Sequence, residues 1–139
     1  MLNELNPFSL FNAVKNPKAI FVFAHGAGAD CEHNFMEEVT LLLNKQGISV
    51  LRFNFNYMDI RREQGSRRPP DRMPKLLTCF ASVLAKLDML ENIPIYIGGK
   101  SMGGRVAATL ACDSDELLSK NLLSSSLFEH IKGVICLGY

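Results

Sequence analysis

The segment from Ile93 to Arg105 constrains the fold of this chain more than any other segment. It reads IPIYIGGKSMGGR, so a β-branched run leads directly into G-x-S-x-G and then into a helical pattern of small residues. Strand, sharp turn and helix in this order are typical of a nucleophile elbow, in which a serine is held at the turn. Bulky residues two positions before or after that serine would collide with the neighbouring strand and helix, and here those positions are Gly99 and Gly103. The segment therefore predicts Ser101 as a nucleophile at the carboxyl edge of a parallel sheet, with the Met102 amide facing a developing oxyanion.

Two other interpretations of this segment are weaker. A phosphate-binding loop requires a glycine five residues before the one that precedes lysine, and that position is Pro94. The remaining alternative is that any turn from a strand to a helix favours Gly and Ser, so that the match arises by chance. A second loop argues against chance.

The second loop follows the apolar run Ala19–Ala24 and reads His25-Gly26-Ala27-Gly28. It resembles the loop that supplies the other oxyanion-hole amide in α/β-hydrolases. Its glycines, Gly26 and Gly28, let the backbone turn beneath a substrate carbonyl, which assigns the donor to the Ala27 amide. A dinucleotide fingerprint would need glycine at position 31, which is Cys31. His25 has two interpretations: it shapes the loop by hydrogen bonding, or it acts as a base or a metal ligand. We favour the first, and we expect no metal and no cofactor.

Four stretches make the chain similar to the α/β-hydrolase superfamily, in its small dienelactone-hydrolase-like branch. Within that branch the chain resembles the group of proteins related to testis-expressed protein 30 and to the third subunit of the NSL complex. The stretches span most of the chain: residues 23–28 (FAHGAG), 52–55 (RFNF), 67–72 (RRPPDR) and 98–105 (GGKSMGGR). The elbow is shared across the superfamily, whereas the arginine-proline stretch indicates this group. The resemblance implies the fold and the site residues rather than a particular substrate.

Length and composition predict one domain over residues 1–139. An apolar fraction of 47% with 21% charged residues is typical of a soluble globular protein. A net charge of +1 provides no general field for nucleic acid or for a membrane surface. We find neither a secretory signal nor a run long enough to span a membrane. The four scattered cysteines favour a reducing cytoplasm; they are Cys31, Cys79, Cys112 and Cys136.

Apolar strands alternate with helical patterns, which predicts a three-layer α/β sandwich with a mostly parallel sheet, as in the α/β-hydrolase fold. The expected strands are Ala19–Ala24, Ser49–Phe55, Pro94–Gly98 and Gly133–Leu137. Helical spacing of apolar residues predicts helices over 35–43, 73–90 and 106–111, whereas 113–132 fits a helix poorly.

Residues 56–72 are expected to form a charged loop on the same edge of the sheet as Ser101. The functional interpretation is a clamp for a carboxylate or phosphate, which arginine binds as a bidentate fork. The alternative is a solvated loop with internal ion pairs. A nucleic-acid site is disfavoured because no aromatic residue is interleaved with the arginines. The candidate anion-binding residues are Arg67, Arg68 and Arg72.

A triad in the order serine, acid, histidine cannot be assembled from the residues after Ser101. His130 directly precedes the last expected strand, so it should lie at the amino edge of the sheet, opposite Ser101; His25 and His33 precede the serine. The expectation is that the chain is an N-terminal part of a longer hydrolase, truncated after Tyr139, with acid and histidine beyond it.

Two functions therefore stay open. One is a serine hydrolase of esterase or thioesterase type acting on a small acyl ester. The other is a non-catalytic hydrolase-like module for binding or assembly, as the related NSL-complex subunit suggests. The apolar strand Gly133–Leu137 further predicts self-association through an unpaired edge.

Overall fold

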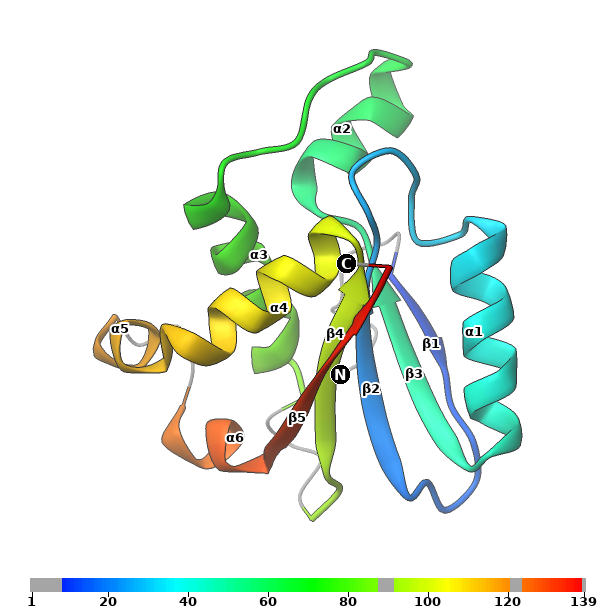
Figure 1. Cartoon of the computed structure of the whole chain (residues 1–139), viewed down its shortest axis with the longest axis vertical. Helices are drawn as coiled ribbons and strands as arrows, with labels where there is room; N and C mark the ends of the chain where they lie inside the picture. The colour runs from blue at the N-terminus through cyan, green and yellow to red at the C-terminus, as the bar shows by residue number, and fades with distance from the viewer. Residues whose placement is uncertain (1–8, 88–91, 121–123, 139) are drawn as a thin grey trace.

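The structure is a computed structural model that describes residues 9–87, 92–120 and 124–138 (Figure 1). Its centre is a five-stranded sheet in the order β1-β3-β2-β4-β5. Neighbouring strands are parallel except for β1, which pairs antiparallel with β3. The strands are β1 Leu10–Asn12, β2 Ala19–Ala24, β3 Ile48–Phe53, β4 Ile95–Lys100 and β5 Ile131–Leu137. The four strands expected from the sequence are confirmed: β2 has the expected bounds, and the bounds of the other three differ from expectation by at most two residues.

Alternate side chains of β2 enter two separate cores, because successive residues of a strand point to opposite faces. Ile20 and Val22 belong to the larger core, which also contains residues of helices α3 (Met73–Ala85) and α4 (Met102–Cys112). Phe21 and Phe23 belong to the smaller core, with Met36 of helix α1 (Asn34–Lys45). Figure 1 shows α1 on one side of the sheet and α4 on the other. The three-layer α/β architecture predicted from the sequence is thus confirmed.

Residues 56–72 are not a loop throughout, which corrects the expectation from the sequence. Their first half forms helix α2 (Asn56–Gln64), which ends at Gly65 with φ 66° and with the Gly65 amide bonded to the Arg61 carbonyl at 2.8 Å. The helix has almost no apolar stripe, and only Tyr57, Met58 and Asp59 are buried. Because the helix signal in a sequence is the spacing of apolar residues, a helix this polar gives none.

Two further differences come from short elements. The segment 113–132, which fits a single helix poorly, contains the short helices α5 (Ser114–Ser119) and α6 (Ser125–His130). Strand β1 was not expected, because three residues carry no alternation that could be distinguished from a loop. The helix expected over 73–90 ends at Ala85, and the end of its predicted range lies outside the described residues.

Candidate active site

Ser101 occupies the sharp turn between β4 and α4. Its backbone has φ 50° and ψ −113°, a region that a non-glycine residue rarely adopts. A Cβ atom at Gly99 would lie 2.5 Å from the Ala24 carbonyl oxygen, and one at Gly103 would lie 2.5 Å from the His25 carbonyl oxygen. Backbone atoms form both obstacles, so neither position accepts a side chain without movement of the chain. The turn therefore depends on glycine on both sides of the serine.

The loop at residues 25–28 lies directly beside this turn. A Cβ atom at Gly26 would lie 3.8 Å from the Ser101 Cβ and 3.4 Å from the Lys100 carbonyl oxygen. A cavity of about 350 Å³ opens here, and Ala27 and Ser101 both line it. Within the described part of the chain, the backbone amides of Ala27 and Met102 donate no hydrogen bond. The Ser101 amide, in contrast, donates to the Leu137 carbonyl at 2.8 Å.

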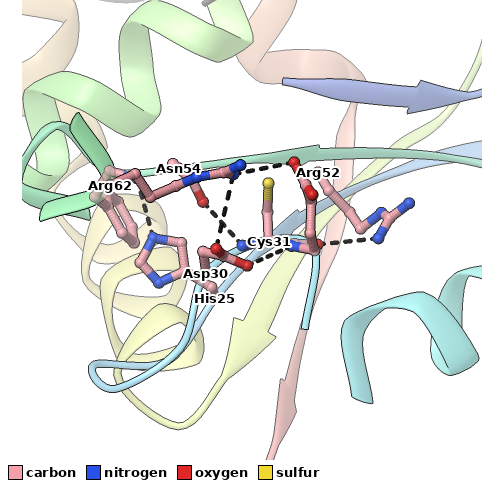
Figure 2. A network of polar contacts seen from close by, with 8 residues as sticks. His25, Asp30, Cys31, Arg52, Asn54 and Arg62 are labelled. Atoms are coloured by element: carbon pink, nitrogen blue, oxygen red, sulfur yellow. Dashed lines mark hydrogen bonds and ion pairs between the residues drawn. The ribbon is translucent and has the colours of Figure 1, made fainter. Parts of the chain in front are cut away.

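His25 is fully buried, and both of its ring nitrogens bond to the backbone of the protein. Its Nε2 accepts a hydrogen bond from the Phe55 amide at 3.1 Å, and its Nδ1 lies 2.6 Å from the Gly26 carbonyl oxygen (Figure 2). Because Nε2 accepts, the proton of the neutral ring is on Nδ1 and is donated to Gly26. Burial lowers the pKa of His25 to about 4. The side chain therefore ties the loop to the end of β3 and has no free nitrogen to act as a base.

Helix α2 holds the same loop from the other side. The Tyr57 hydroxyl donates to the Ala27 carbonyl at 3.1 Å, and the Arg61 guanidinium donates to the same oxygen at 3.4 Å. Burial raises the pKa of Tyr57 to about 12, so its phenol keeps the proton that it donates. These contacts fix the peptide that follows Ala27 and hence the direction of the loop. Sequence reasoning missed both residues, because nothing in the sequence marks α2 as a helix.

A buried network supports the loop as it continues toward α1 (Figure 2). The Asn54 side chain accepts from the Cys31 amide at 2.8 Å, and Arg52 donates to the Cys31 carbonyl at 3.0 Å. Burial raises the pKa of the Cys31 thiol to about 12, which leaves it a poor nucleophile at neutral pH. Cys31 is thus a buried structural residue.

The structure places the other histidines as follows. His130 ends α6 immediately before β5, and its Nδ1 bonds to the Ser126 carbonyl at 2.7 Å. His130 precedes β5 and Ser101 follows β4. Because these two strands are parallel, His130 and Ser101 lie at opposite ends of the strands, as predicted, and Figure 1 shows α6 far from the start of α4. His33 lines the cavity with Ser101, and its Nδ1 accepts from the Phe35 amide at 3.4 Å. Among the described residues, no histidine is hydrogen-bonded to Ser101.

The three candidate anion-binding arginines do not line one common hollow. Arg67 lines a groove that shares Gly28 and Asp30 with the Ser101 cavity. Arg68 and Arg72 line a hollow with Pro69 and Pro70, and Arg68 also lies 4.0 Å from the Asp71 carboxylate. Of the three, Arg67 is the one beside the candidate active site. Among the described residues, no group of histidine, cysteine and acidic side chains could hold a metal ion, and no helix combines the length and the hydrophobicity that a membrane span requires.

This fold, with its serine turn and adjoining glycine loop, is that of an α/β-hydrolase. A family model described as an alpha/beta hydrolase domain matches residues 17–139, and the chain belongs to that family.

Particular relatives agree with this assignment. The chain is 27% identical over 112 residues to a monoglyceride lipase homolog of Monkeypox virus, covering 80% of this chain and 39% of the viral protein. Among solved structures, Est1E from Butyrivibrio proteoclasticus superposes with a TM-score of 0.59 at 22% identity, covering 83% of this chain and 42% of Est1E. Dienelactone hydrolase from Anabaena variabilis gives 0.59 at 15% identity, covering 93% and 77%. The chain spans less than half the length of the viral protein and of Est1E.

Proposed function

We propose that the chain carries the nucleophile and oxyanion hole of a serine hydrolase, of the esterase or thioesterase type, acting on a small acyl ester. The observation that carries this proposal is Ser101 at φ 50° on the turn between β4 and α4, at a cavity that Ala27 also lines. A strained serine at this turn is the hallmark of a nucleophile elbow. The monoglyceride lipase homolog and the esterase among the similar proteins support a carboxylic-ester substrate.

In the proposed reaction the Ser101 Oγ attacks the acyl carbonyl carbon while its proton passes to a base. The carbonyl oxygen becomes an oxyanion that accepts hydrogen bonds from the Ala27 and Met102 amides. Collapse of the tetrahedral intermediate expels the alcohol or thiol and leaves an acyl-serine, which water then hydrolyses. His25 does not fit the role of base, because its ring nitrogens are occupied and its pKa is lowered to about 4. The proposal assigns the base and its acid to no residue of this chain.

A different observation supports a second candidate function, a non-catalytic hydrolase-like module for binding or assembly. Within the described residues Ser101 has no histidine partner, and a serine without a base is a slow nucleophile. Membership of the group related to testis-expressed protein 30 and the NSL-complex subunit belongs to this proposal, supported by the arginine-proline stretch. Four free cysteines, two of them buried, support a reducing cytoplasm as the compartment.

The deciding experiment is labelling with a fluorophosphonate probe, followed by mapping of the adduct. We expect a single adduct at Ser101, absent from Ser101→Ala and retained in the control Ser82→Ala, whose hydroxyl bonds within α3. Hydrolysis of p-nitrophenyl acetate by the same proteins separates the two functions. Turnover near the enzyme median of about 10 s⁻¹ that disappears in Ser101→Ala indicates a complete hydrolase. Labelling with negligible turnover favours the module, and labelling elsewhere overturns the nucleophile.

A further inference from the structure

Lys100, the residue between Gly99 and the nucleophile, has a side chain placed to act on a substrate. It ends β4 and lines the cavity of about 350 Å³ together with Ser101 and Ala27. Its ammonium nitrogen lies 4.9 Å from the centre of the Phe35 ring, in the first turn of α1. A cation over the face of an aromatic ring is attracted to it and loses freedom of movement. The charge is therefore held beside the candidate nucleophile.

The charges around the cavity leave Lys100 without a carboxylate partner. Asp30 is the acidic residue of the cavity wall, and its carboxylate lies 3.7 Å from Arg62, which also binds Glu32 at 3.0 Å. Lys100 takes part in no ion pair with any residue that the structure describes. The adjoining groove adds Arg61 and Arg67 to the same region. The balance of charge beside Ser101 is therefore positive.

We infer that Lys100 is a specificity residue for an acyl group that carries its own carboxylate, such as the half-ester of a short dicarboxylic acid. This inference rests on the proposed function, because it takes Ser101 as the acylated residue. The reacting carbonyl lies at Ser101 with its oxygen toward the Ala27 and Met102 amides. The free carboxylate of the same acyl group then meets the Lys100 ammonium across the cavity. A short acyl chain fits, because both groups line one small cavity.

The test compares two p-nitrophenyl esters of similar size, the anionic monoester of glutaric acid and the neutral ester of pentanoic acid. The measured quantity is the ratio of their rates of Ser101 acylation, followed by p-nitrophenol release and by mass. We expect the wild type to favour the anionic ester and Lys100→Met to lower the ratio about tenfold, as for a charged hydrogen bond. Lys100→Arg should retain the preference, and so should Lys45→Met, an exposed lysine in the last turn of α1. An unchanged ratio in Lys100→Met overturns the inference.

A binding measurement keeps this inference separate from the proposed function. Free glutarate is titrated into the protein while the backbone amide signals of Lys100, Ser101 and Ala27 are followed by NMR. Shifts that are weakened by Lys100→Met and retained in Lys45→Met support the anion site even if neither ester acylates Ser101. In that case the hydrolase proposal alone fails. Acylation by both esters, without any glutarate-induced shift and without a preference, removes the anion site and leaves the hydrolase.

Discussion

A fall in pH from 7.5 to 5 should destabilise this protein through His25 in particular. The imidazole is fully buried, and its pKa is lowered from 6.5 to about 4, mainly because burial disfavours the charged ring. The hydrogen bond to Gly26 and the charge of Asp30 oppose this shift, whereas the charge of Arg61 adds to it. Between the two pKa values the unfolded chain binds a proton at this residue and the folded chain does not. Stability must therefore decrease as the pH falls through that window.

The magnitude follows from the two pKa values. A shift from 6.5 to about 4 corresponds to a total of about 3 kcal/mol between neutral pH and a pH below both values. Over the accessible range from pH 7.5 to 5, the linkage relation gives a loss of about 2 kcal/mol from His25 alone. Such a loss is a substantial share of the roughly 5–15 kcal/mol that stabilises a typical domain. It should be visible in equilibrium unfolding.

The assay is urea unfolding at pH 7.5 and pH 5 of the wild type, His25→Asn and the control His130→Asn. The wild type and the control should each lose about 2 kcal/mol more than His25→Asn between the two pH values. Because His25→Asn could fail to fold, the ring Cε1 proton of His25 is also followed by NMR in the wild type. A His25 ring that titrates near pH 6.5 refutes the argument. So does a His25→Asn variant with the same pH dependence as the control.

Three shorter predictions concern the site and the sheet edge. Gly103→Ala should lower the free energy of unfolding by about 2 kcal/mol, because its Cβ would lie 2.5 Å from the His25 carbonyl oxygen. The control Gly28→Ala, whose Cβ would have no atom within 4 Å, should leave the urea midpoint nearly unchanged. Tyr57→Phe should slow fluorophosphonate labelling several-fold without abolishing it, because the Tyr57 hydroxyl donates to the Ala27 carbonyl at 3.1 Å and so holds the loop at residues 25–28. An unchanged labelling rate would contradict this role. We propose that the chain self-associates through the edge strand β5, where Val134 is 36% exposed. The mass measured by light scattering should rise with protein concentration in the wild type and rise less in Val134→Lys. A wild type that stays monomeric at all concentrations would refute the proposal.

The turn at Ser101 could be predicted from the sequence because its signal lies in a few adjacent residues. A side chain two positions before or after Ser101 would meet the Ala24 or His25 carbonyl at the end of the neighbouring parallel strand β2, so glycine at both positions signals the turn. The burial of β2 on both faces of the sheet could be predicted equally well. Every residue of β2 is buried, and a continuous apolar run is what a parallel strand covered on both faces requires.

The support of the site was decided only by the tertiary structure. Tyr57 donates to the Ala27 carbonyl, which lies 30 residues earlier in the sequence, from a helix with almost no apolar stripe. The Lys100 ammonium lies over the ring of Phe35, which belongs to helix α1, and no pattern in the sequence predicts this contact. Arg67 lines a different hollow from Arg68 and Arg72, although the three residues are close in the sequence. Local spacing specifies a strand, a turn or a helix, whereas contacts between distant segments depend on how those elements pack, and it is the packing that sets the charge and the donors around Ser101.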